Sequence, residues 1–263
     1  MVKASKALEV VYYQGVYQQR LRNVSLLVPS IIWVRKGTKQ LSYRQGSLDL
    51  DASHLFIVAA HERFTFVNLP LEQCFHSTQF CFHIAPEASM LKRSLAVSKR
   101  FIPVVTLSPA MQQTLLSLST IDLSLISDAV QSHWVAGVYQ QLAEEGALHL
   151  LFPTAVLSFS QQLCRFLQQN LAAPSLIDDA CLHFAISRAT LIRRLKAENT
   201  QFGVLLRELR MNHALGLMQA GLANQLELAI ACGYLSQSRF SQRFTEHFGL
   251  SPKQYRDTLA LIE

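Results

Sequence analysis

The sequence predicts an α+β fold with a β-rich first half and an all-α second half. From Leu8 to about Ile84, short apolar runs are separated by glycine, proline and polar clusters, a pattern typical of antiparallel strands. Around Ser108 the spacing of apolar residues lengthens from two to nearly four, and from Thr154 onward the pattern is helical almost throughout. We therefore expect two domains, residues 1–150 and residues 151–263.

The composition is that of a folded protein with ordinary hydrophobic cores. Half of the 263 residues are hydrophobic and 16% are charged, which excludes a disordered chain. The net charge of +6 favours a polyanionic partner. Nine of the eleven basic residues after position 150 are arginines, whose planar guanidinium suits phosphate and guanine.

Nothing in the sequence indicates export or a membrane. The five cysteines are scattered and form no CxxC pair, which argues against a disulfide framework and for a reducing compartment. Glu9 interrupts the only apolar run near the N-terminus, and no other run approaches the roughly 18 apolar residues that a membrane span requires. We therefore expect a cytoplasmic protein with no membrane partner.

In the first domain, alternation with period two marks the strands. QLSYRQG, SLDLD and ERFTFV alternate apolar and polar residues, whereas LFIVAA is typical of a buried strand. These segments predict an antiparallel barrel or sandwich. A strand with a glycine turn, a second strand and a step into the buried LFIV run together resemble a cupin-like β-barrel, so we expect that fold with trailing helices.

Residues 109–145 are expected to form those trailing helices. Apolar residues recur there every four positions, which indicates two helices with apolar seams. The seam of the second helix consists of Ile126, Val130, Trp134, Val138 and Leu142. Such a seam is buried either on the barrel or against a second subunit, so a homodimer stays open.

The second domain contains two segments of similar build. LIDDACLHFAISRATLIRRLKAE and LELAIACGYLSQSRFSQRFTEHFG each predict a helix, a short turn and a second helix, with Ser187 and Ser236 as N-caps. In the second segment, Phe240, Phe244 and Phe248 form one apolar stripe, which we interpret as core. Residues 202–218 predict a connecting helix of roughly 25 Å.

Helix phase places a polar face on each second helix, where a helix-turn-helix unit would read a major groove. In the first unit we expect Arg193 to contact guanine, Ala189 and Ile192 to contact thymine methyl groups, and Arg188 and Lys196 to contact phosphates. In the second unit the base-reading residues are expected to be Gln237, Ser238, Arg239 and Gln242, with Ser236 and Arg243 at phosphates.

Four sequence elements carry a specific resemblance. R-M-N-H-A-x-x-L-M, L-A-x-A-C-G-Y, S-x-S-x-F-S-x-x-F and F-G-L-S-P-x-x-Y-R are similar to the signature of the AraC/XylS family of bacterial transcription regulators, over about residues 155 to 258. The resemblance implies two helix-turn-helix units joined by one helix, double-stranded DNA and RNA polymerase as partners, and activation of transcription. It also implies that the barrel is a sensing or dimerising domain.

One departure from the family pattern affects how much each helix-turn-helix unit contributes to base recognition. Ala189 and Ile192 are apolar, although they occupy positions where family members read bases. We therefore expect the first unit to rely more on DNA shape and the second unit to carry more of the hydrogen-bonded reading.

The histidines and cysteines of the first domain raise the question of a metal. In CFHSTQFCFH the pair Cys74 and His76 recurs as Cys81 and His83, which on a hairpin would place each pair on one face. No strict metal spacing supports a zinc site, so we predict no metal, no cofactor and no enzyme activity. The alternative is a cupin-type metal-binding protein or enzyme with a nucleic-acid tether.

A small-molecule effector is a further expectation for a barrel of this kind. Arg35, Lys36, Lys39 and Arg44 would attract an anionic effector such as a carboxylate. Basic residues on strands also protect sheet edges against aggregation, and the sequence leaves both interpretations open.

Overall fold

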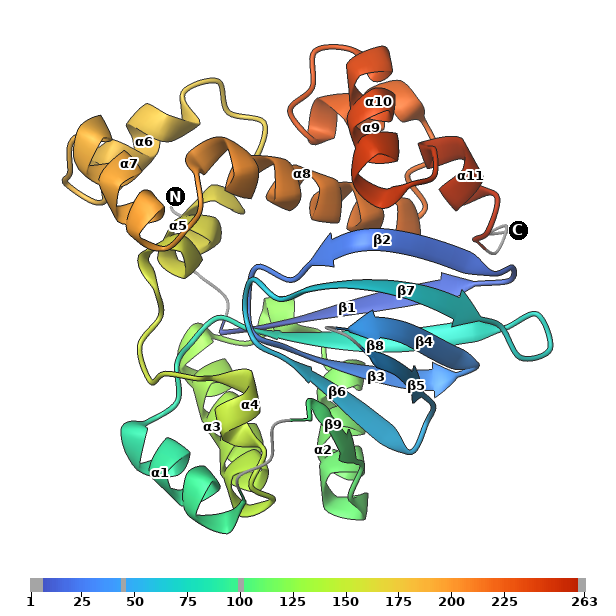
Figure 1. Ribbon diagram of the computed structural model, residues 1–263, viewed down its shortest axis with the longest axis vertical. Coiled ribbons are helices and arrows are strands. Elements are labelled where there is room, and N and C mark those ends of the chain that lie inside the picture. Colours follow the sequence, from blue (N-terminus) through green and yellow to red (C-terminus); the bar gives the residue numbers. More distant parts are fainter. Residues whose placement is uncertain (1–6, 44–45, 99–101, 260–263) are drawn as a thin grey trace.

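The structure is a computed structural model that describes residues 7–43, 46–98 and 102–259. It has the predicted α+β class, with two sheets in the first half and helices throughout the second (Figure 1). One expected effector residue, Arg44, lies outside the described residues. No helix in the described part of the chain is long and apolar enough to cross a membrane.

Two antiparallel sheets form the first domain. The larger has the order β1-β8-β3-β6-β9 and the smaller β2-β7-β4-β5. The strands are β1 (Leu8–Gly15), β2 (Gln19–Ser25), β3 (Ser30–Lys36), β4 (Thr38–Tyr43), β5 (Gly46–Leu50), β6 (His54–Val58), β7 (Arg63–Leu69), β8 (Phe75–Phe82) and β9 (Val104–Thr106). The cupin-like architecture is thus confirmed, but the strands form two separate sheets instead of a closed barrel.

The larger sheet is apolar on both faces because each face covers a different core. In β3, Ile32 and Val34 point to one hydrophobic cluster, while Ile31 and Trp33 point to another. This alternation follows from the two-residue period of a strand. It explains why β3 and LFIV of β6 appear in the sequence as continuous apolar runs.

Helices cover the outer face of the larger sheet, in the lower half of Figure 1. They are α1 (Ala88–Val97), α2 (Pro109–Thr120), a 3-10 turn η1 (Leu123–Leu125), α3 (Asp128–Glu144) and α4 (Leu148–Leu151). The two helices expected in residues 109–145 are α2 and α3, whereas α1 and β9 were not predicted.

The seam of α3 is buried within the chain, although its members differ from those expected. Val138 and Leu142 are fully buried, but Val130 is 42% exposed and Gln131 and Val135 are buried in its place. A strict four-residue spacing advances by about 400° per step, so residues four apart drift around the helix. The early members of the predicted seam have rotated toward solvent.

The second domain consists of helices α5 to α11, in the upper half of Figure 1. They are α5 (Phe159–Leu167), α6 (Leu176–His183), α7 (Arg188–Ala197), α8 (Phe202–Gln219), α9 (Gln225–Ala231), α10 (Gln237–Phe248) and α11 (Pro252–Arg256). In Figure 1, α8 connects the pair α6–α7 at one end to the pair α9–α10 at the other.

The two helix pairs are held by different cores. The pair α6–α7 packs with α5 and one half of α8 in a cluster to which, among the described residues, the first domain contributes only Leu27, in the turn between β2 and β3. By contrast, Phe240, Phe244 and Phe248 of α10 belong to the same cluster as the inward side chains of both sheets. The hydrophobic interior of the sheets therefore continues into the second helix pair.

Polar contacts also join the two domains. Arg63 Nη2 of β7 lies 2.5 Å from Glu208 Oε1 of α8. The Gln14 backbone N–H donates to Gln219 Oε1 at 2.9 Å, and the Val16 backbone N–H donates to the Thr258 carbonyl at 2.9 Å. The strands therefore contact α8 and the segment after α11 directly.

Candidate DNA-binding face

The first helix pair has the geometry of a helix-turn-helix unit. The Ser187 hydroxyl accepts a hydrogen bond from the Thr190 backbone N–H and so caps α7, as the sequence predicts. Leu191 and Leu195 are fully buried against α5 and α6. The opposite face of α7 is exposed and consists of the predicted residues Arg188, Ala189, Ile192, Arg193 and Lys196.

The second pair repeats this geometry 49 residues later. Ser236 corresponds to Ser187, and its hydroxyl accepts a hydrogen bond from the Arg239 backbone N–H. The helix then ends at Gly249, whose φ of +85° is a left-handed conformation that glycine adopts without strain. The outer face of α10 is exposed and consists of the predicted residues Gln237, Ser238, Arg239, Gln242 and Arg243, with Ser236 partly buried at the cap.

Several of these exposed side chains have partners within the chain. Arg188 pairs with Asp178 at 2.8 Å, and Gln237 donates to Gln225 at 2.5 Å. Gln242 and Arg243 both contact the carboxylate of Glu246, each at 2.9 Å. Solvent-exposed pairs of this kind contribute little free energy, so phosphate or base contacts can replace them at small cost.

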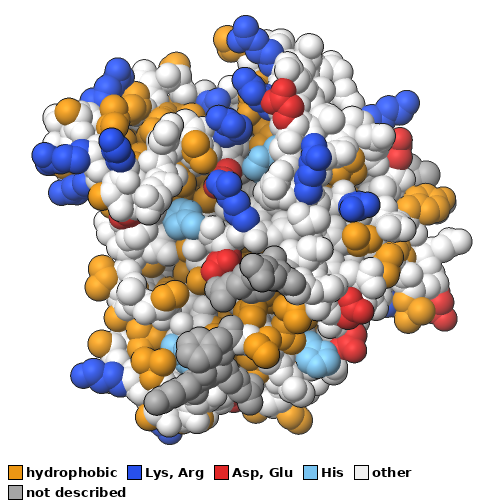
Figure 2. Space-filling view, viewed as in Figure 1, with side chains coloured by type: hydrophobic (Ala, Val, Ile, Leu, Met, Phe, Trp, Pro, Cys, Tyr) orange, Lys and Arg blue, Asp and Glu red, His pale blue; other side chains and the backbone are white. Residues whose placement is uncertain are grey.

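Three basic residues of the predicted set have no such partner among the described residues. Arg193, Lys196 and Arg239 are exposed and make no ion pair with any residue that the structure describes. Their charges are therefore available to an external anion. Figure 2 shows Lys and Arg side chains gathered over the helical upper half of the molecule and sparse over the lower half.

The connecting helix α8 has the length that the sequence predicts. Its 18 residues span roughly 27 Å at 1.5 Å per residue. Successive major grooves on one face of B-DNA lie about 34 Å apart. A helix of this length, with a recognition helix packed at each end, suits two adjacent major grooves.

Comparison with known proteins supports this description of the second domain. A family described as "Helix-turn-helix domain" matches residues 180–258. The regulator YdeO of Escherichia coli strain K12 is 37% identical over 105 residues, which cover 40% of this chain and 41% of YdeO. Residues 180–258 therefore form a helix-turn-helix domain of the AraC/XylS type, as the sequence motifs predict.

Other similar proteins extend the comparison. The virulence regulon transcriptional activator VirF of Shigella flexneri is 26% identical over 122 residues, 46% of this chain and 47% of VirF. The chain thus matches less than half of the length of YdeO and VirF.

Solved structures of ToxT from Vibrio cholerae resemble the whole chain. The structure of ToxT with a bound unsaturated fatty acid has a TM-score of 0.63 at 15% identity, covering 99% of this chain and 98% of ToxT. A second structure, with (E)-4-(8-methylnaphthalen-1-yl)but-3-enoic acid, has a TM-score of 0.62 at 14% identity, covering 97% of this chain and all of ToxT. At this identity the likeness shows a shared two-domain fold.

Base reading by the AraC/XylS-type domain can be tested at single residues. Replacing Arg193 or Gln242 with alanine is expected to relax preference at particular base pairs by about 1 to 3 kcal/mol, because each would lose hydrogen bonds to one base edge. Binding competition against a library of single-base variants measures this preference. Lys196→Ala is the control, since loss of a phosphate contact weakens all sequences alike. An equal loss on every sequence for Arg193→Ala would contradict its assignment.

The structure separates the basic residues expected to hold an effector. Arg35 is exposed and stacks on the Trp33 ring at 4.4 Å, and Lys36 pairs with Glu72 at 3.1 Å. Lys39 alone points inward and is only 4% exposed. Of the expected set within the described residues, Lys39 is therefore the one that lines a cavity.

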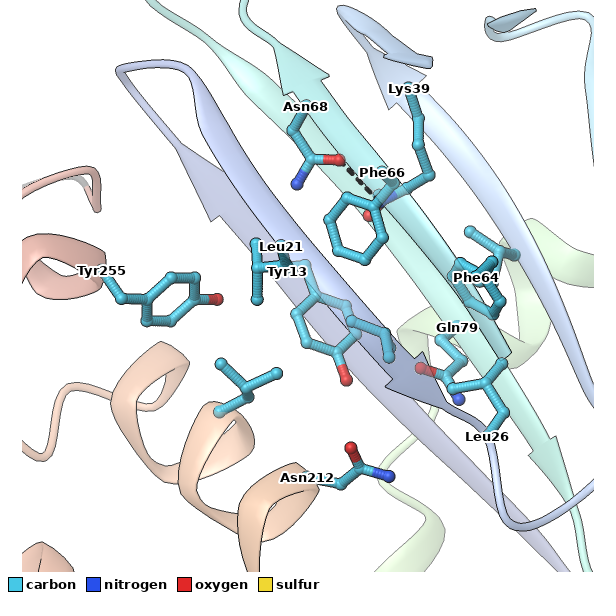
Figure 3. Close-up of a pocket in the computed structure, with 14 residues that line it drawn as sticks. Tyr13, Leu21, Leu26, Lys39, Phe64, Phe66, Asn68, Gln79, Asn212 and Tyr255 are labelled. Atoms are coloured by element: carbon cyan, nitrogen blue, oxygen red, sulfur yellow. Dashed lines mark hydrogen bonds between the residues drawn. The ribbon is translucent and has the colours of Figure 1, made fainter. Parts of the chain in front are cut away.

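That cavity lies between the two sheets, α8 and α11 (Figure 3). It has a volume of about 70 Å³ and adjoins a groove of about 670 Å³ between β1, β8 and α8, with which it shares the wall residues Tyr13, Leu26, Gln79 and Asn212. Its walls are mostly apolar side chains of the strands, closed by Asn212 and Leu215 of α8 and Tyr255 of α11. Both domains thus line the cavity.

Lys39 is a buried cation without a described carboxylate beside it. Its ammonium donates to Asn68 Oδ1 at 2.6 Å and lies 3.6 Å from the centroid of the Phe66 ring. Burial lowers the pKa of Lys39 to about 7. The position therefore suits an anion that restores the ammonium charge.

A chain of buried side chains leads from Lys39 to the end of the second domain. Asn68 Nδ2 donates to Gln19 Oε1 at 2.8 Å, and Gln19 Nε2 donates to Thr258 Oγ1 at 3.0 Å. Asn68 and Gln19 are both almost fully buried. A change in the hydrogen bonding of Lys39 is thus connected to the segment that follows α11.

The cysteine and histidine pairs do not form a hairpin. Residues Phe75–Phe82 form one continuous strand, β8, which places Cys74 and His83 beyond its opposite ends, roughly 30 Å apart. Cys81 is buried between Ser30 and Gln79, while His76 is exposed. Among the described residues no group of three or more histidine, cysteine or acidic side chains is arranged to hold a metal.

Proposed function

We propose that the protein is a transcription regulator, acting as an activator, which inserts α7 and α10 into successive major grooves of double-stranded DNA. The observation that carries this proposal is the repeated capped helix with an exposed polar face, at both ends of α8. VirF, a similar protein, is named as a transcriptional activator, which supports the direction of control. We keep residues 1–150 as the sensing domain and 151–263 as the DNA-binding domain.

Genome-wide mapping of DNA bound by the full-length chain tests this function. The expected result is a set of sites upstream of genes, each with two half-sites about one helical turn apart. Transcript levels of those genes should fall when the gene that encodes this protein is deleted. Bound sites with no shared two-part sequence would contradict paired major-groove reading.

We further propose that an apolar carboxylic acid is the effector and that its carboxylate pairs with Lys39. The buried, unpaired ammonium supports the acid, and the apolar cavity and adjoining groove support an apolar body. The bound molecules of the two ToxT structures, an unsaturated fatty acid and an aryl butenoic acid, are of this class. Because Asn212, Leu215 and Tyr255 come from the second domain, an acid bound there would contact both domains.

The pH dependence of acid binding provides a test. Because burial lowers the Lys39 pKa to about 7, the ammonium is the minor form above that pH, and a bound carboxylate must bring a proton with it. Affinity for (E)-4-(8-methylnaphthalen-1-yl)but-3-enoic acid is therefore expected to fall by up to about tenfold for each pH unit above 7. Calorimetric titration measures it.

Two controls isolate Lys39 from general effects of pH. In Lys39→Met the affinity should be weaker near neutral pH and no longer depend on pH, because the titrating group is absent. The primary amide of the same acid should bind the unchanged chain without this pH dependence. A flat pH profile for the acid on the unchanged chain would contradict its pairing with Lys39.

A further inference from the structure

We propose that Arg210 is a positioning residue that fixes the two helix-turn-helix units of the DNA-binding domain at one relative orientation. The inference rests on the proposed function, in which both units bind one DNA molecule. Arg210 belongs to the arginine-rich second domain, yet it lies half-buried on α8 instead of on the exposed faces of α7 and α10. Its position therefore favours a contact within the protein over a contact with DNA.

The Arg210 guanidinium joins the two units. On one side, its Nε and Nη2 both donate to the Leu171 carbonyl, at 3.2 and 3.0 Å, in the segment between α5 and α6. On the other side, its central carbon lies 5.6 Å from the centroid of the Tyr234 ring, in the turn between α9 and α10. One side chain thus contacts both units and the helix that connects them.

Gly233 shows how closely the parts meet. A Cβ at this position would lie 2.6 Å from Arg210 Nη2 and 2.7 Å from the Leu171 carbonyl oxygen, closer than such atoms approach. The φ of Gly233 is +73°, which also favours glycine. The backbone of the second unit, the guanidinium and the backbone of the first unit therefore touch at one place.

This contact matters because the two units have separate hydrophobic cores. The buried residues Leu205 and Leu209 of α8 belong to the core of the first unit. Met211 and Leu215 belong to the core of the second unit, and the two sets form distinct clusters. Apart from α8 itself, the units are thus linked near the α9–α10 turn by the Arg210 guanidinium and by the approach of the Gly233 backbone to the Leu171 carbonyl.

A fixed orientation would make the protein selective for the distance between half-sites. One inserted base pair shifts a half-site by about 3.4 Å and rotates it by roughly 35° around the DNA axis. A rigid pair of recognition helices fits only one half-site spacing. A loosened pair fits several spacings, but it binds the optimal spacing with lower affinity.

The experiment uses the full-length chain and a duplex selected in vitro from a random library. Three further duplexes are derived from it, with one half-site scrambled, one base pair inserted between the half-sites, or one base pair removed. Binding is measured for the unchanged chain and for Arg210→Ala. Arg207→Ala is the matched control, because Arg207 is exposed on the same helix and the same charge is lost.

The unchanged chain is expected to lose about tenfold in affinity when the spacing changes by one base pair. Arg210→Ala should bind the original duplex about tenfold more weakly, bind the half-site duplex as the unchanged chain does, and show little further loss on insertion. Arg207→Ala should keep the original spacing dependence. Gly233→Ala, whose Cβ displaces the guanidinium, should relax the spacing dependence like Arg210→Ala.

Either of two results would overturn the inference. One is an unchanged spacing profile for Arg210→Ala; the other is an equal loss on full and half-site duplexes, which indicates a general structural defect. The failure of the proposed function has a different signature, since the unchanged chain itself would then be indifferent to scrambling one half-site.

Discussion

Replacing Phe244 with alanine is expected to lower the free energy of unfolding by about 3 to 5 kcal/mol, because its ring is fully buried and alanine leaves a cavity. Phe244 shares one core with the inward side chains of both sheets. The first domain should therefore be destabilised together with α10.

Tryptophan fluorescence can measure this coupling. The chain has two tryptophans, Trp33 on β3 and Trp134 on α3, and both lie in the first domain. The denaturant midpoint of their signal should fall in Phe244→Ala. Leu235→Ala, at a side chain that is 99% exposed, should change stability by no more than about 0.5 kcal/mol. A tryptophan transition that does not move in Phe244→Ala would show that the domains unfold independently.

Salt should weaken DNA binding steeply. Three exposed basic residues of the predicted face are expected at phosphates: Arg188, Lys196 and Arg243. If each neutralises one phosphate, the logarithm of the binding constant falls with the logarithm of salt concentration with a slope of about −2.7. Between 50 and 200 mM salt this is a loss of roughly fortyfold.

A pair of variants tests which charges produce this slope. Arg243→Gln should reduce its magnitude by about 1, because one phosphate contact is lost. Arg35→Gln removes an exposed charge that stacks on Trp33 in the first domain, and it should leave the slope unchanged. A binding constant that hardly depends on salt would contradict the phosphate contacts altogether.

The helix-turn-helix units could be predicted from the sequence because their signals are local. The caps Ser187 and Ser236 lie three residues before the N–H groups that they accept from, and Phe240, Phe244 and Phe248 repeat at the helical period. Each of these features depends on neighbours within a single helix or turn. The structure therefore agrees with them residue by residue.

The cavity could not be predicted in the same way because its walls are far apart in the chain. Lys39, Asn68 and Tyr255 meet only after the sheets have formed and α11 has docked. One local signal was present, since Lys39 occupies the same inward register of β4 as the buried Leu41, whereas Gln40 between them is exposed. A lysine at an apolar position of an alternating strand indicates a buried cation.

The role of Arg210 was hidden for a related reason. From the sequence it is one of nine arginines that favour a polyanionic partner. Only the folded chain shows that its guanidinium is directed to Leu171 and Tyr234, in segments on either side of α8. Composition alone cannot separate an arginine that binds DNA from one that holds the binding domain together.

The unequal attachment of the two helix pairs should also be visible in amide hydrogen exchange. The first pair has its own core, to which the described residues of the first domain contribute only Leu27, so α6 and α7 can open locally while the rest stays folded. Amides of α10, β2 and β7 should exchange with solvent in the same opening event, because all three elements surround one hydrophobic interior. The first helix-turn-helix unit would then open by local unfolding, whereas the second would open only when the first domain unfolds.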